Sequence, residues 1–198
     1  YKDYIRKFKI NNFVETEYII EKQRMIKDDD EISNIIKACN ITDDCFKYIL
    51  GYIKPGMTEK QIAKEIEEYY AERCEGISFE TIVASGENSS KPHAVPTDRK
   101  IQEKDIITID MGCKVNGYCS DMTRTFFVGE PTEEMKKVYD IVLNNQKFAI
   151  EQYKDGANAR QITKMIENDF KLNGYNLIHS LGHGVGLEIH ELPFMSYR

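Results

Sequence analysis

The chain has 198 residues, of which 41% are hydrophobic and 30% are charged, and this balance suits one globular domain with a sizeable core. Its net charge of -6, without a long basic run, argues against nucleic acid or an anionic membrane as the main partner. No apolar run approaches the ~18 residues of a membrane span, and the start YKDYIRKFKI lacks the apolar core and cleavage site of a signal peptide.

The five cysteines are an odd number and lack the spacing of a secreted disulfide framework. We expect reduced thiols in a cytoplasmic protein at Cys39, Cys45, Cys74, Cys113 and Cys119. The first residue is not Met, so we also expect the chain to begin inside a longer protein.

The first two predicted helices follow each other closely. Apolar residues at helical spacing begin at Asp29, and Pro55-Gly56 ends this helix. Thr58 and Gln61 form a capping box, which predicts the start of a second helix.

Three strands are predicted after this helix pair. Residues 79–85 form the first, and a loop rich in Gly, Ser, Asn and Pro follows at 86–99. Residues 105–112 and 118–128 form the other two strands, with a short turn between them.

A second helix pair follows the strands. Pro131 opens a helix that runs to about residue 153, and Asn158 caps another that runs to about residue 172. This pair repeats the first at an offset of one hundred residues: Lys54, Gly56, Gln61, Ile62, Lys64, Ile66 and Glu67 match Lys154, Gly156, Gln161, Ile162, Lys164, Ile166 and Glu167. The ordered match favours an internal duplication of helix, helix, strand and hairpin over chance. We therefore expect the second hairpin to begin a few residues beyond Arg198.

The turn at Asn116-Gly117 is the strongest short hairpin signal, because a type I′ turn needs positive φ at both positions. In a regular hairpin Gly112 faces Asp121, which makes Asp110 and Asp121 diagonal neighbours on one face, within roughly 7–8 Å. Two such carboxylates repel unless a proton or cation lies between them. The hairpin therefore predicts a site for one or two divalent metal ions; the alternative is two solvent-facing aspartates.

Three of the four histidines lie in HSLGHGVGLEIHELP, residues 179–193. Ser180 stands where an HExxH zinc helix has glutamate, and the glycines favour a strand and tight loop over a helix. One histidine is more often structural, but three in a glycine-rich loop favour a site, and nitrogen beside carboxylates suits Mn, Fe, Co or Zn. His93 lies in the loop after the first strand, and by itself it does not decide between a site and a structural role.

Together, FETIVASGENSSKPHAVPTD, DIITIDMGCKVNGYCSDMTRTF and HSLGHGVGLEIHELP resemble the Xaa-Pro aminopeptidase and prolidase branch of the pita-bread metallopeptidases, relatives of methionine aminopeptidase. The resemblance covers residues 24–198 and implies an α+β pita-bread fold with a pseudo-twofold repeat whose second half is incomplete. RMIKDDDEI resembles the junction after an N-terminal domain. We therefore expect a tail or linker from a missing N-terminal domain at 1–28 and a partial catalytic domain at 29–198.

The resemblance also implies roles for individual residues. The implied metal ligands are Asp110, Asp121 and His183. The implied substrate-binding residues are His93, His179 and His190, of which His93 and His190 would also be catalytic. The two remaining ligands of the family are glutamates, which we expect beyond the end of this chain. Ala94 stands where the family usually has Gly.

The activity implied by the resemblance is hydrolysis of the Xaa-Pro bond at the N-terminus of peptides or in dipeptides. Two divalent metal ions, with manganese favoured and Co, Zn or Fe as substitutes, would carry a bridging hydroxide as the nucleophile. The partner would be a peptide with proline at its second position, and the family implies a homodimer. Without the two glutamates, this segment is expected to bind metal weakly and to turn over slowly.

Three alternatives stay open. A non-catalytic binding module of the same fold would have lost the metal ligands, whereas Asp110, Asp121 and His183 are all present. A creatinase-like hydrolase would need no metal, and elemental analysis would identify both of these cases. A methionine aminopeptidase would prefer Met-Ala over Ala-Pro peptides.

Overall fold

The computed structural model describes residues 6–8, 14 and 16–196. Its elements, in chain order, are α2 (Ile19–Met25), α3 (Asp29–Tyr52), α4 (Glu59–Ala71), β1 (Ile82–Ser85), the short 3-10 helix η1 (Gly86–Ser90), β2 (Ile106–Met111), β3 (Lys114–Val115), β4 (Tyr118–Cys119), β5 (Met122–Phe127), α5 (Glu133–Gln152), α6 (Ala159–Leu172), β6 (Gly182–Gly184) and β7 (Glu191–Met195). This mixture confirms the predicted α+β class. In the described part of the chain, no helix combines the length and apolar character needed to cross a bilayer.

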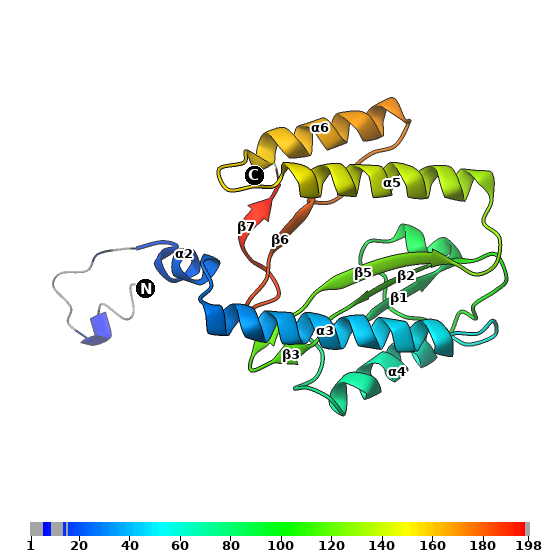
Figure 1. The fold of residues 1–198 in the computed structure, drawn as a ribbon, viewed down its shortest axis with the longest axis horizontal. Helices are drawn as coiled ribbons and strands as arrows, with labels where there is room; N and C mark the ends of the chain where they lie inside the picture. Colours follow the sequence, from blue (N-terminus) through cyan, green and yellow to red (C-terminus); the bar gives the residue numbers. More distant parts are fainter. Residues whose placement is uncertain (1–5, 9–13, 15, 197–198) are drawn as a thin grey trace.

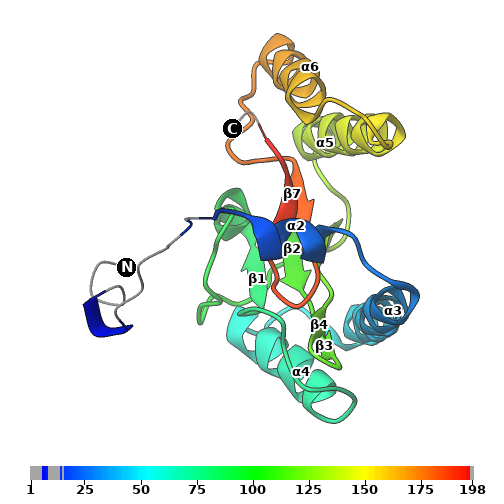
Figure 2. The same ribbon diagram turned by 90° about the vertical axis from the view of Figure 1, so that its left-hand side faces the viewer.

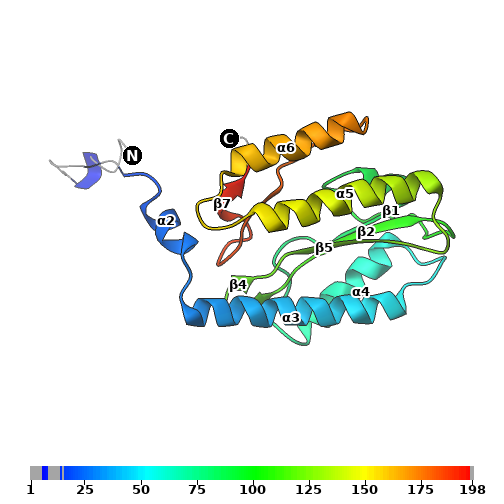
Figure 3. The same ribbon diagram turned by 45° about the horizontal axis from the view of Figure 1, so that its top comes forward.

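The main sheet is antiparallel, in the order β1-β2-β5, and it separates two layers of helices. Helices α3 and α4 lie on one side, while α5 and α6 lie on the other with the small β6–β7 sheet (Figures 1 and 3). Strand β2 alternates in burial: Ile107, Ile109 and Met111 are fully buried in the core that α3 and α4 cover. Asp110 alternates with them and therefore lies on the opposite face, toward the second layer.

The hairpin has the predicted register. Val115 pairs with Tyr118, and Asp110 pairs with Thr123, on either side of the turn. Asn116 and Gly117 have φ values of 50° and 81°, as a type I′ turn requires.

The hairpin is nevertheless divided into two ladders, because the side chain of Ser120 replaces a backbone acceptor. The Cys113 N–H donates to Ser120 Oγ at 2.9 Å, so the Ser120 carbonyl points elsewhere and accepts from Ser78 Oγ at 2.8 Å. A Cβ at Gly112 would stand 2.0 Å from that carbonyl oxygen. Gly112 is thus required by a close backbone approach at the break between the two ladders.

The two helix pairs repeat each other in geometry as well as in sequence. Gly56 and Gly156 both have positive φ, 93° and 79°, in the turn between the helices of each pair. The turns close with equivalent hydrogen bonds, from Met57 N–H to the Lys54 carbonyl (3.2 Å) and from Ala157 N–H to the Lys154 carbonyl (2.9 Å). The pairs differ in their packing, because α3 and α4 cover a sheet whereas the buried cluster beneath α5 and α6 is much smaller.

Several predicted boundaries need correction. The first strand is shorter than predicted and begins at Ile82. Helix α5 begins at Glu133, because Thr132 is its N-cap and accepts from the Met135 N–H at 3.2 Å; Pro131 lies outside the helix. Strand β7, which pairs with β6, was not predicted.

The predicted tail at residues 1–28 also contains structure. Residues 1–5, 9–13 and 15 lie outside the described residues, but α2 occupies the later part of this stretch. Helix α2 contacts β7, and Figure 2 shows the two side by side.

Candidate metal and substrate site

Two aspartates occupy the face of the hairpin that α3 and α4 leave open. Asp110 comes from β2, and Asp121 lies in the break between β4 and β5. The Oδ1 atom of Asp110 is buried and has no hydrogen-bond partner. Burial, followed by the negative charge of Asp110, raises the pKa of Asp121 to about 6, although His183 opposes this shift. The two carboxylates therefore repel each other unless a proton or a cation lies between them.

His183 faces this pair from the other layer of the molecule. Its Nε2 lies 3.5 Å from Oδ2 of Asp121, and the two side chains are 20% and 25% exposed. Its Nδ1 lies 3.1 Å from the Gly184 carbonyl oxygen, which can only accept, so Nδ1 carries the proton in the neutral ring. Nε2 then presents a lone pair to a carboxylate oxygen. Two acceptors facing each other need a proton or a cation between them.

His190 packs against His183, with the ring centroids 4.2 Å apart. Burial lowers the pKa of His190, and the charges of His183 and His93 lower it further. His190 is therefore a neutral imidazole near pH 7, with one N–H to donate and one nitrogen to accept.

The two remaining histidines differ in their relation to this cluster. His93 is exposed on the loop after η1, but it is near enough to His190 to act on its pKa. His179 is exposed, and its Nδ1 lies 2.6 Å from the Ser180 carbonyl oxygen. Among the described residues, no contact joins His179 to Asp110, Asp121 or His183. The fold therefore brings five of the six predicted site residues together, and the roles of all six stay predictions.

The ligand atoms of Asp110, Asp121 and His183 are of the kinds that bind divalent metal ions. Carboxylate oxygens with one imidazole nitrogen suit Mn, Fe, Co or Zn, and a cation would satisfy the buried Asp110 oxygen. The set of metal ligands is incomplete, however. Within the part of the chain that the structure describes, no three His, Cys, Asp or Glu side chains are placed so that they could hold a metal ion.

The residue that holds the His93 loop was not predicted from the sequence. Glu59, at the start of α4, is fully buried, and each of its two carboxylate oxygens accepts several hydrogen bonds. Its partners at one end of the loop are Ser85 and Asn88, and its partner at the other end is Thr97. Nothing in the sequence marks this role, because acidic residues are common in the first turn of any helix.

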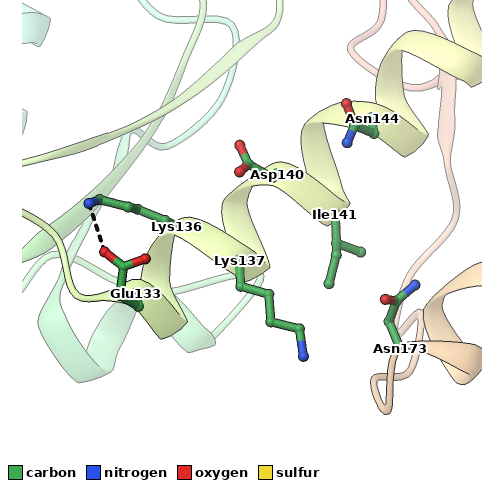
Figure 4. Close-up of a pocket in the computed structure, with 7 residues that line it drawn as sticks. All are labelled: Glu133, Lys136, Lys137, Asp140, Ile141, Asn144 and Asn173. Atoms are coloured by element: carbon green, nitrogen blue, oxygen red, sulfur yellow. Dashed lines mark hydrogen bonds and ion pairs between the residues drawn. The ribbon is translucent and has the colours of Figure 1, made fainter.

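A separate hollow lies along α5, away from the aspartates and histidines (Figure 4). Its lining is mostly charged and amide side chains, with Asn173 from beyond α6 facing them, and Lys136 and Glu133 pair there at 3.0 Å. It contains none of the four histidines, so it does not extend the candidate site.

Comparisons with known proteins cover nearly the whole chain. The model of metallopeptidase family M24 matches residues 33–198. An uncharacterized peptidase of Bacillus subtilis, YqhT, is 39% identical over 90% of this chain and 52% of its own length. A Xaa-Pro dipeptidase of Pyrococcus furiosus is 39% identical over 98% of this chain and 57% of its own length. The chain thus spans little more than half the length of these curated relatives.

Solved structures agree with these matches. An X-Pro aminopeptidase from Thermotoga maritima superposes with a TM-score of 0.91 at 37% identity, over all of this chain and 57% of its own. A prolidase from Pyrococcus furiosus gives 0.91 at 39% identity, over 98% of this chain and 60% of its own. This likeness confirms the pita-bread fold that the sequence predicted. By sequence and by fold, the chain belongs to metallopeptidase family M24.

Proposed function

We propose that the protein hydrolyses the Xaa-Pro bond of peptides or dipeptides at a site built around Asp110, Asp121 and His183. The observation that carries this proposal is the His183 Nε2 atom, 3.5 Å from Oδ2 of Asp121, beside a buried Asp110 oxygen without a hydrogen-bond partner. The names of the relatives, a Xaa-Pro dipeptidase and a prolidase, support the choice of substrate.

Asp110, Asp121 and His183 would hold divalent metal ions, with manganese as the proposed metal. When bound, such ions supply Lewis acidity that activates a water molecule and polarises a peptide carbonyl. Ligands from elsewhere in the full-length protein would complete the site, because three described side chains do not close around an ion.

The histidines would bind and orient the peptide. His190 is neutral near pH 7, so its ring N–H can donate to the scissile carbonyl oxygen as negative charge develops there. His93 and His179 would also contact the substrate. The five free thiols support a reducing, cytoplasmic environment as part of the same proposal.

The test has a binding arm and a catalytic arm. Titration of the 198-residue chain with Mn²⁺ should give weak binding that Asp121→Asn abolishes, while Asp44→Asn, at an exposed aspartate on α3, leaves it unchanged. Equal binding by the wild type and Asp121→Asn would refute the assignment of the ligands.

The catalytic arm uses the full-length protein with Ala-Pro and Met-Ala peptides. We expect metal-dependent cleavage of Ala-Pro. A preference for Met-Ala would overturn the choice of substrate in favour of a methionine aminopeptidase, and cleavage that persists without metal would indicate a creatinase-like hydrolase. Binding of peptide that needs no metal and leads to no cleavage would favour a binding module.

A further inference from the structure

The first residue of β7 carries a buried carboxylate that the proposed mechanism does not use. Glu191 is 7% exposed, and it pairs with two cations from the α2 segment, residues 19–27, which comprises α2 and the two residues after it. Arg24 donates to one carboxylate oxygen and Lys27 donates to the other, the latter at 2.9 Å. Arg24 also reaches Glu188, at 3.3 Å, so its guanidinium joins two acidic residues of the same loop.

The same carboxylate shapes the loop between β6 and β7 from within. The Glu188 N–H donates to Glu191 Oε1 at 3.0 Å, which closes the loop across its own end. Gly186 packs directly against the carboxylate, because a Cβ there would stand 2.5 Å from Glu191 Oε2. On its other side, the Gly186 carbonyl accepts from the Cys119 N–H at 2.8 Å. The loop is therefore fixed between the Glu191 carboxylate and strand β4.

This loop joins the two histidines of the candidate site. His183 lies at its start in β6, and His190 immediately precedes Glu191. Their rings are in contact, and His183 faces Asp121. A shift of the loop would change the position of both imidazoles relative to the aspartates.

We propose that Glu191 is a positioning residue for His183 and His190, and that Arg24 and Lys27 hold it in place, so that the α2 segment forms part of the site. The effect on catalysis rests on the function proposed above, whereas the effect on the histidines does not. A buried carboxylate that loses both cations is uncompensated, so it must move toward solvent or take up a proton. Movement of the carboxylate releases the Glu188 N–H, and protonation weakens the hydrogen bond from that N–H because a neutral carboxyl is a poorer acceptor. Both changes loosen the loop.

The experiment observes the four histidines directly in the metal-free, 198-residue chain. Selective labelling gives one ring signal for each histidine, and replacing each histidine in turn with Gln assigns the signals. The test variant is Arg24→Met/Lys27→Met. The matched control is Lys60→Met, which removes an exposed ion pair with Asp98 at 2.8 Å, away from α2.

We expect the ring signals of His183 and His190 to shift in the double variant while His179 keeps its position. Amide exchange at Glu188 should become about tenfold faster, as for the loss of one hydrogen bond. Arg24→Lys keeps the positive charge but removes the guanidinium that contacts both Glu188 and Glu191. It should therefore shift the His183 and His190 signals by less than the double variant does.

The proposal is overturned if His183 and His190 shift no more than in Lys60→Met, or if all four histidines shift alike, which would indicate general loosening. If circular dichroism shows that the double variant does not fold, the same comparison of the four histidine signals is made with Arg24→Lys. No metal or substrate enters this test. Failure of Mn²⁺ to broaden the His183 signal in the wild type would instead refute the proposed metal site.

Discussion

Replacement of Glu59 by Gln should destabilise the protein far more than an isosteric change normally does. Every partner of the Glu59 carboxylate is a donor: Oε1 accepts from the Ser85 N–H at 2.7 Å, and Oε2 accepts from the Thr97 N–H at 2.9 Å. The hydroxyls of both residues and the Asn88 amide add further bonds. A Gln side chain must turn its own NH₂ toward one of these backbone N–H groups.

The number of lost and weakened hydrogen bonds sets the size of the destabilisation. One backbone N–H loses its acceptor, at a cost of about 1–3 kcal/mol, and the remaining bonds lose the strengthening provided by a charged acceptor. The hydroxyls can rotate to accept from the amide, and the NH₂ can turn toward Thr97, which is the more exposed side. We therefore expect a loss of about 2–4 kcal/mol in the free energy of unfolding at pH 7.

The loss should depend on pH. Burial alone would raise the pKa of Glu59, but hydrogen bonds from Thr97, Ser85 and Asn88 outweigh it and lower the pKa below its ordinary value of 4.5. The ionised carboxylate therefore contributes stability above that value, and the contribution disappears as the pH falls through the folded-state pKa. The difference between the wild type and Glu59→Gln should shrink below about pH 4.

Urea unfolding followed by circular dichroism measures both effects. Glu68→Gln is the control, because Glu68 lies on the same helix, its side chain is 59% exposed, and its ion pair with Lys64, at 3.3 Å, is a surface contact. The control should change the stability by less than about 0.5 kcal/mol. A Glu59→Gln protein as stable as the control at pH 7 would refute the role assigned to the buried carboxylate.

Further substitutions test the packing and the backbone. Ile109→Ala, on the buried face of β2, should lower the free energy of unfolding by about 2–5 kcal/mol, as measured in urea. Thr108→Ala, on the open face, should lower it by less than about 1 kcal/mol. Equal losses would contradict the assignment of the two faces. Gly112→Ala places a methyl group 2.0 Å from the Ser120 carbonyl oxygen, so we expect a large loss of thermal stability. An unchanged melting temperature would contradict this close approach of the two backbones. Gly51→Ala adds a methyl group near the end of α3, where no atom lies within 4 Å of it. This change should instead stabilise the protein by about 0.5–1 kcal/mol. Destabilisation would argue against the open environment of that position.

Features that depend on neighbours along the chain could be predicted from the sequence. Thr58 and Gln61 form the predicted capping box, and Asn158 caps α6. The turn residues Asn116 and Gly117 fix the hairpin register, and alternation along the strands then places both aspartates on one face. These features follow from backbone geometry over a few residues, so a single sequence is enough to specify them.

Tertiary structure alone decided which residues meet across the molecule. The sequence identified His183 and Asp121 separately, but only the packing of β6 against the hairpin shows that the His183 nitrogen faces the Asp121 carboxylate. The pairing of Arg24 with Glu191 joins residues 167 positions apart, and no local pattern encodes it. Burial decides the energetic importance of such side chains, because a carboxylate is inexpensive in water and must be fully partnered in the interior. For this reason the sequence indicated the chemistry of the site, and the fold determined which of its charged residues hold that site in place.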